Sequence, residues 1–186
     1  MQPSDLIAFE REVAERFERG EIRAPVHLSG GNEEQLIAIF KDVRREDWVF
    51  STWRSHYHAL LHGVPPEKVM AQIMAGRSMN LNFPEHRFLT SAIVGGILPI
   101  ACGVAYAGER VWCFVGDMTA SIGAFQDADL FSRGHSYPVH FVIEDNGLST
   151  NTPTHFAWGS PRWVEHPRYR YKRTFPHVGS GVFVPF

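Results

Sequence analysis

Two apolar runs, separated by a stretch long enough for a helix, constrain the fold of this chain more than any other feature. The first run is Val111-Trp112-Cys113-Phe114-Val115, and the second spans residues 139 to 143. Short apolar runs of this kind are typical of buried strands, and two parallel strands need a crossover connection, which is nearly always right-handed. We therefore predict a strand, helix, strand unit in an α/β fold with a parallel sheet. The inner face of the crossover helix is expected to carry Ile122, Phe125, Leu130 and Phe131.

Each apolar run ends in polar residues that suit a ligand site. Gly116 and Asp117 follow the first run, and Asn146 closes the second. Ligands of parallel sheets bind in the crevice outside the carboxyl ends of the strands, and Mg²⁺ prefers one or two protein oxygens together with phosphate oxygens. The first hypothesis is a diphosphate cofactor held through a metal. The alternative is that Gly-Asp and Asp-Asn-Gly are ordinary turns.

The chain before residue 110 is expected to be mostly helical. A first helix is predicted from a Ser4 cap to Gly20, because Leu6, Phe9, Val13 and Phe17 recur at helical spacing. Asn32 and Gln35 form a capping pair for a second helix, and Pro66 and Gly76 mark the ends of a third. Trp48 begins a short extended segment, and residues 91 to 107 are predicted to form a buried helix that Pro99 bends or starts.

The composition after residue 154 changes, and we treat residues 155–186 as an aromatic-rich carboxyl-terminal extension of an α/β domain formed by residues 1–154. The aromatic side chains there show no clear period: Trp158, Trp163, Tyr169, Tyr171, Phe175, Phe183 and Phe186. We expect them to cover the core or a partner surface. A surface that stacks RNA bases is disfavoured because the chain has no basic excess elsewhere.

The overall composition narrows the class of protein. With 186 residues, 44% hydrophobic, the chain can form one core of ordinary domain size. A net charge of −2 gives no basic stripe for nucleic acid or an anionic membrane.

Cys102 and Cys113 are expected to be buried, reduced thiols of a cytosolic protein. The start of the chain lacks the pattern of a secretory signal, and the polar and glycine content of residues 89 to 107 argues against a membrane span. We therefore expect a cytoplasmic protein.

An ordered series of segments resembles one known family. The series is Gly-Glu-Ile-Arg-Ala-Pro-Val-His-Leu-Ser (20 to 29), Asp-Trp-Val-Phe-Ser-Thr-Trp-Arg-Ser-His-Tyr-His (47 to 58), His-Gly-Val-Pro-Pro-Glu (62 to 67), Ser-Ala-Ile-Val-Gly-Gly-Ile-Leu-Pro (91 to 99), Val-Gly-Asp (115 to 117) and Glu-Asp-Asn-Gly (144 to 147). It resembles the thiamine-diphosphate-binding alpha subunit of the dehydrogenase (decarboxylating) component of 2-oxo acid dehydrogenase complexes. The resemblance covers about residues 4 to 154, and the ordered set is more specific than any one segment.

The resemblance implies a set of site residues. The Asp117 carboxylate, the Asn146 side chain and the Leu148 carbonyl would bind Mg²⁺, and Arg54 would contact the diphosphate. The other implied cofactor contacts are Trp53, Gly116, Met118 and the backbone at Ala92 and Val94. Trp53 stands where the family commonly has tyrosine, and Met118 replaces a glycine. His56 matches a family histidine near the cofactor and is the predicted catalytic residue. A structural histidine is an equal alternative.

The resemblance also implies a reaction and a partner. The expected activity is decarboxylation of a 2-oxo acid or a related carbonyl substrate, followed by transfer of the acyl or aldehyde unit. The chain contains only the diphosphate half of such a site, so a pyrimidine-binding beta-type subunit is the expected partner. The chain departs from the family in lacking a glycine-rich cover loop after Gly76, and residues 161 to 186 match neither the later strands nor the histidine-bearing loop of the family.

Two other interpretations stay open at this point, and two more are disfavoured. One alternative is a transketolase-like ketol transferase subunit. The other is a non-catalytic subunit with a binding or regulatory role. A zinc site formed by His56, His58 and His62 is disfavoured because the sequence offers no evident fourth ligand. A Rossmann-like nucleotide binder is disfavoured because no Gly-x-Gly-x-x-Gly follows the run at 111 to 115.

Overall fold

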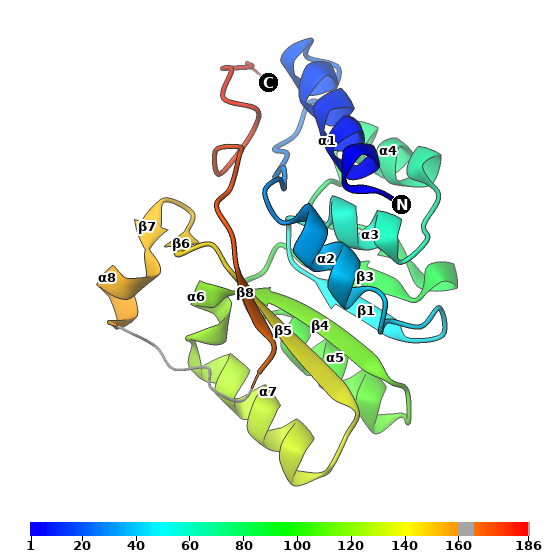
Figure 1. Ribbon diagram of the computed structural model, residues 1–186, viewed down its shortest axis with the longest axis vertical. Coiled ribbons are helices and arrows are strands. Elements are labelled where there is room, and N and C mark those ends of the chain that lie inside the picture. Colours follow the sequence, from blue (N-terminus) through cyan, green and yellow to red (C-terminus); the bar gives the residue numbers. More distant parts are fainter. Residues whose placement is uncertain (160–165, 186) are drawn as a thin grey trace.

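A mainly parallel six-stranded sheet forms the centre of the molecule (Figure 1). The structure is a computed structural model that describes residues 1–159 and 166–185. In spatial order the strands are β2 (Asn82–Phe83), β3 (Phe88–Thr90), β1 (Trp48–Ser51), β4 (Val111–Gly116), β5 (Val139–Asp145) and β8 (Arg168–Arg170). β2 pairs antiparallel with β3, and the other neighbouring pairs are parallel. The predicted α/β fold with a parallel sheet is confirmed.

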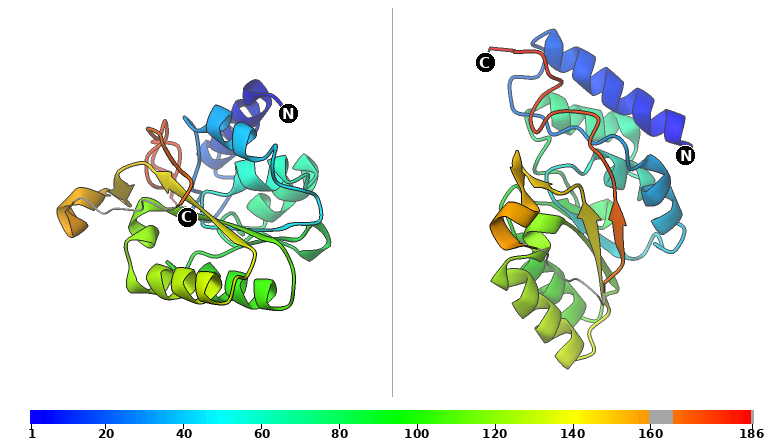
Figure 2. Two further views of the ribbon diagram at one scale, coloured as in Figure 1. Left: turned by 60° about the horizontal axis from the view of Figure 1, so that its bottom comes forward. Right: turned by 60° about the vertical axis from the view of Figure 1, so that its left-hand side comes forward.

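Helices cover both faces of this sheet (Figure 2). The helices on one face are α1 (Pro3–Glu18), α2 (Glu33–Ile39), α3 (His56–Leu61) and α4 (Pro66–Met74). Those on the other face are α5 (Ile97–Tyr106) and α7 (Gly123–Gly134). The short elements are η1 (Pro84–His86), α6 (Asp117–Ala120), the hairpin of β6 (Leu148–Ser149) with β7 (Thr152–Pro153), and α8 (Thr154–Trp158). No helix in the described parts of the chain is long and apolar enough to cross a membrane.

Strand β4 is buried on both faces, which explains its unbroken apolar sequence. Trp112 and Phe114 pack with the layer of α1 to α4, whereas Val111, Cys113 and Val115 pack with α5 and α7. A parallel strand covered on both sides has no solvent-facing positions and therefore does not alternate. β4 and β5 are adjacent and in register from Val111–Val139 to Gly116–Glu144. The predicted parallel unit is confirmed, and both cysteines are free and buried.

The inner face of the crossover differs from the prediction. Phe125 is buried, but Leu130 is 70% exposed and Phe131 is 43% exposed. The buried positions of α7 are instead Phe125, Ala128, Asp129 and Ser132. Small side chains bring α7 close to α5, where Cys102 Sγ lies 3.3 Å from Ser132 Oγ. The prediction failed because it selected large apolar residues rather than the helical period that starts at Phe125.

The predicted helix ends were partly right. α4 begins at Pro66, as predicted. The helix predicted for residues 91 to 107 begins only at Ile97, and Pro99 lies in its first turn. Ser4 is not a cap, because proline is favoured at a first helical position and α1 begins at Pro3. Asn32 stands at the cap position of α2, but no side-chain capping bond forms there. Its Nδ2 donates instead to the hydroxyl of Tyr169, at 3.0 Å.

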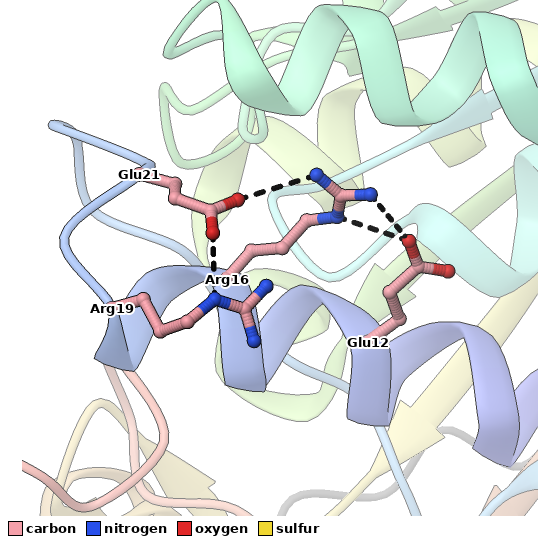
Figure 3. Close-up of polar contacts among 4 residues, drawn as sticks. All are labelled: Glu12, Arg16, Arg19 and Glu21. Carbon is pink, nitrogen blue, oxygen red and sulfur yellow. Dashed lines mark hydrogen bonds and ion pairs between the residues drawn. The ribbon is translucent and has the colours of Figure 1, made fainter.

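Charged side chains join the end of α1 to the turn that follows it (Figure 3). Arg16 Nη2 lies 2.8 Å from Glu12 Oε1, and Arg16 Nη1 lies 3.2 Å from Glu21 Oε2. Arg19 Nε donates to Glu21 Oε1 at 2.6 Å, and this bond lowers the pKa of Glu21. Exposed ion pairs contribute little to stability, so these contacts orient the turn more than they stabilise the fold.

The carboxyl-terminal extension is part of the fold. β8 pairs with the end of β5, from Ile143–Arg168 to Asp145–Arg170, and the chain then runs back beside the amino-terminal helices (Figure 1). Tyr169 and Phe175 pack against the core, as predicted for the aromatic residues, whereas Phe183 is exposed. Val184, which was not predicted, is also buried there. The edge strand was not predicted. Trp163 and Phe186 lie outside the described residues.

Two glycines allow this segment to approach the amino-terminal layer. Gly30 and Gly31 have φ angles of +107° and +88°, a region that residues with a Cβ rarely adopt. A Cβ on Gly31 would also lie 2.3 Å from the carbonyl oxygen of Lys172. The glycine pair therefore fixes the path of the residues after β8.

Candidate functional site

The carboxyl ends of the central strands surround a cleft. Parallel pairing brings together the residues that follow β1, β3, β4 and β5 at one edge of the sheet. The cleft holds about 590 Å³ of empty space, including its opening to solvent. Of the predicted site residues, those that line it are Trp53, Arg54, Val94, Gly116, Asp117, Met118, Asn146 and Leu148. The two polar strand ends singled out in the sequence therefore face one cavity.

Asp117 stands directly after β4, as the first residue of α6. Its side chain is 1% exposed, and Oδ2 accepts a hydrogen bond from the hydroxyl of Thr154. Burial raises the pKa of Asp117 above its ordinary value, and the nearby Asp145 carboxylate raises it further. The hydrogen bond from Thr154 lowers the pKa, but by less than burial raises it. A buried carboxylate beside a second carboxylate is stabilised by a cation.

Asn146 has a fixed side-chain orientation. Its Oδ1 accepts the backbone N–H of Leu148 at 2.9 Å, and its Nδ2 donates to the hydroxyl of Tyr171 at 3.1 Å. Because an N–H group can only donate, the atom facing Leu148 must be the amide oxygen. The first bond closes an Asx turn between β5 and β6. The amide oxygen keeps a further lone pair after this bond, and Asn146 lines the same cleft as Asp117.

Arg54 supplies a positive charge to the same cleft. Its Nη2 donates to the carbonyl oxygen of His177 at 3.0 Å and lies 3.0 Å from His177 Nδ1. Its Nε is buried and has no hydrogen-bond partner in the described chain. Burial lowers the pKa of Arg54, but the guanidinium stays charged at any physiological pH. Arg54 thus places a guanidinium in the cleft lining and retains one N–H donor without a protein acceptor.

Two other predicted residues have side-chain partners at the cleft rim. The indole of Trp53 stacks on His27 with ring centroids 5.4 Å apart and meets the ring of His177 edge-on at 5.8 Å. Met118 Sδ lies 2.8 Å from Nε1 of Trp158 in α8. Both positions line the cleft with large side chains.

Only part of the segment after β3 lines the cleft. Val94 lines the cleft and is 48% exposed, and its neighbour Ile93 is 72% exposed. Ala92 is not among the lining residues, and its N–H donates to Asn80 Oδ1 at 3.2 Å. The structure thus places Val94 at the cleft and Ala92 beside it.

His56 lies in the core rather than in the cleft lining. It is 0% exposed, with Nδ1 2.9 Å from Glu10 Oε1 and Nε2 2.9 Å from Ser78 Oγ. Both ring nitrogens are therefore engaged in this conformation, and the catalytic role stays a prediction. His58 has a different partner, Glu144 Oε1, at 3.1 Å. The described residues contain no group of three His, Cys, Asp or Glu side chains placed to hold a metal.

Three residues at or next to the cleft were not among the predicted site residues. Glu144 lines the cleft, and its Oε1 also accepts the hydroxyl of Tyr169. Tyr171 lines the cleft beside Asn146, and burial raises its pKa to about 12. Thr154 binds Asp117 from the start of α8. Tyr171 was not predicted because the extension has no period from which its contacts could be inferred.

The fold and the cleft define the class: an α/β protein with a polar ligand site at the carboxyl edge of a parallel sheet. Comparison of the whole chain then gives the family. The model described as "Dehydrogenase E1 component" matches residues 4–168, and the chain belongs to this family.

Its relatives include two kinds of alpha subunit. The pyruvate dehydrogenase E1 component subunit alpha of Porphyra purpurea is 32% identical over 82% of this chain and 51% of its own length. The alpha subunit of acetoin:2,6-dichlorophenolindophenol oxidoreductase from Cupriavidus necator is 29% identical, over 84% of this chain and 52% of its own length. The chain thus spans about half the length of these relatives. Among solved structures, a thiamin diphosphate-dependent enzyme from Mycobacterium smegmatis aligns with a TM-score of 0.43 and 16% identity, over 68% of this chain and 22% of that one.

Proposed function

We propose that this chain binds thiamine diphosphate and Mg²⁺ in the cleft, as the diphosphate-binding half of a two-component enzyme. Asp117, Asn146 and the carbonyl of Leu148 would hold the metal, and Arg54 would bind the diphosphate. One observation carries the proposal. A buried carboxylate and an oriented amide oxygen line the same cleft as an arginine whose Nε has no partner.

The chemistry of these donors fits the cofactor. Mg²⁺ takes one or two protein oxygens and completes its coordination with phosphate oxygens and water. The bond from Thr154 does not use up the lone pairs of the Asp117 carboxylate. The Asn146 amide oxygen likewise keeps a lone pair after it accepts the backbone N–H of Leu148. A guanidinium matches the geometry of phosphate oxygens. The raised pKa of Asp117 is consistent with a cation site, because a bound cation would favour the ionised form.

The proposed reaction is cleavage of a bond next to a carbonyl in a 2-oxo acid or a related substrate, with transfer of the acyl or aldehyde unit. Thiamine diphosphate supplies the electron sink for such chemistry when bound. The residues of this chain would anchor the diphosphate end, and the exposed Ile93 and Val94 would meet the rest of the cofactor. We propose a pyrimidine-binding beta-type subunit as the partner that completes the site.

Calorimetric titration tests the binding step. Thiamine diphosphate added to the chain in the presence of Mg²⁺ should bind, and thiamine without phosphates should bind far more weakly. EDTA should abolish the binding, since the metal joins the diphosphate to Asp117. Absence of binding at millimolar ligand, by the chain alone and with a beta-type partner, would favour a non-catalytic subunit.

A second assay tests the reaction class. The chain and a beta-type partner are supplied with thiamine diphosphate, Mg²⁺ and either a 2-oxo acid or a ketose phosphate. Release of CO₂ from the 2-oxo acid, dependent on both chains, is the expected result. Transfer of a ketol unit without release of CO₂ would instead assign a transketolase-like activity.

A further inference from the structure

The residue after β8 reaches the cleft from a segment that the family resemblance did not cover. The backbone N–H of Tyr171 donates to the carbonyl oxygen of Asp145 at 3.0 Å, which continues the pairing of β8 with β5. Figure 1 shows β8 beside β5 at the edge of the sheet. This pairing places the phenol of Tyr171 in the cleft lining together with Arg54, Asp117 and Asn146.

The hydrogen bond between Tyr171 and Asn146 has a defined direction. Asn146 Oδ1 faces a backbone donor, so Nδ2 faces the phenol and donates to it at 3.1 Å. A hydroxyl group can accept and donate at the same time. Because Tyr171 accepts here, its own proton remains to be donated, and no acceptor for it occurs within residues 1–159 and 166–185.

The neighbouring phenol of Tyr169 shows the contrast. Its hydroxyl accepts from Asn32 Nδ2 and donates to Glu144 Oε1, so both of its hydrogen-bonding functions are used inside the protein. The hydroxyl of Tyr171 likewise accepts from an asparagine Nδ2, that of Asn146. Tyr171, however, lines the cleft. Within the described residues, the hydroxyl proton of Tyr169 has a protein acceptor and that of Tyr171 has none.

We propose that Tyr171 is a ligand-binding residue of the cleft, which accepts from Asn146 and donates its hydroxyl proton to an anionic oxygen of the ligand. The oxygen belongs to the diphosphate, so this inference rests on the proposed function. Trp53 has no hydroxyl to offer the ligand, and Tyr171 supplies one from the carboxyl-terminal segment. A donor already polarised by the Asn146 amide forms a stronger bond to an anion.

The test uses inorganic pyrophosphate with Mg²⁺ as the probe and calorimetry as the readout. Tyr171→Phe keeps the ring and removes the hydroxyl, and it should weaken pyrophosphate binding roughly 10- to 100-fold, the range for a lost hydrogen bond to a charged group. Tyr57→Phe is the matched control, because its buried hydroxyl donates to Glu33 Oε1 at 3.0 Å away from the cleft. This control should bind pyrophosphate as the wild type does.

The outcomes separate this inference from the proposed function. No pyrophosphate binding by the wild-type chain would overturn the proposed site itself. Wild-type binding that Tyr171→Phe leaves unchanged would overturn the role of Tyr171 alone. If Tyr171→Phe does not fold, 3-fluorotyrosine at position 171 provides a second readout. Its ¹⁹F signal should shift when pyrophosphate and Mg²⁺ are added together, and an unmoved signal would also refute the contact.

Discussion

Replacing Asp117 by asparagine should stabilise the ligand-free chain at neutral pH while weakening its binding of a divalent cation. The side chain is 1% exposed, and burial raises its pKa above the ordinary value of 3.8. A carboxyl group whose pKa rises on folding binds its proton more tightly in the folded state. Its contribution to stability is therefore present below pH 3.8 and is lost as the pH rises through the folded-state pKa. Asparagine is similar in shape and carries no charge, so it avoids this loss.

The magnitude follows from two opposing effects. The hydrogen bond from Thr154 would change from charge-assisted to neutral, which costs about 1 kcal/mol. The pKa of Asp117 is raised even with that bond in place, so the cost of burying the charge outweighs it. We expect a net gain on the order of 1 kcal/mol, which corresponds to a rise in melting temperature of about 2–4 °C for a chain of this size.

Melting temperatures of the wild type and Asp117→Asn, measured at neutral pH and below pH 3.8, provide the test. The gain should appear at neutral pH and vanish in acid, where both side chains are uncharged. Asp127→Asn is the control, because Asp127 is an exposed carboxylate of α7 and should show little change. Two results would contradict the explanation that burial raises the pKa of Asp117. One is a variant that melts below the wild type at neutral pH, and the other is a rise in melting temperature that is as large in acid as at neutral pH. Mg²⁺-dependent pyrophosphate binding should fall by roughly 100-fold or more, since the metal loses its charged ligand.

Three other substitutions have expected outcomes that simple assays can check. Arg54→Ala should weaken pyrophosphate binding by a few kcal/mol at most, the scale of a lost charge-assisted hydrogen bond, and wild-type affinity in calorimetry would remove this residue from the site. Tyr169→Phe should lower the free energy of unfolding in urea by about 1–3 kcal/mol, because Asn32 Nδ2 loses its acceptor; an unchanged midpoint would mean that this bond contributes nothing. Gly31→Ala should displace the segment at Lys172, since the new Cβ would clash with its carbonyl oxygen. Faster proteolysis after β8 is the expected sign, and wild-type resistance would contradict it.

The parts of the fold that the sequence predicted have a strong local cause. The run at 111–115 is apolar because both faces of β4 are covered. The strand could therefore be predicted from this run alone, without knowledge of its neighbouring strands. Pro66 fixed the start of α4 through its φ angle and its missing donor. The meeting of Asp117 and Asn146 followed from parallel topology alone, since adjacent parallel strands end at one edge.

The features that the sequence missed depend on contacts between distant segments. β8 has three residues, and its pairing with β5 rests on a register that no local pattern encodes. Asn32 was predicted to cap a helix with its side chain, but that side chain bonds to Tyr169, a residue far along the chain. Tyr171 enters the cleft for the same reason. Short-range patterns could not predict these partners, because each depends on the path of the carboxyl-terminal segment.

A crystal structure of the chain grown with thiamine diphosphate and Mn²⁺ would show directly whether Asp117 and Asn146 share a metal, because Mn²⁺ replaces Mg²⁺ and can be located by its anomalous scattering. We expect one metal peak bound by the Asp117 carboxylate, the Asn146 amide oxygen and the Leu148 carbonyl, with diphosphate oxygens completing the coordination. A metal and diphosphate bound elsewhere on the chain, with this cleft empty, would contradict it.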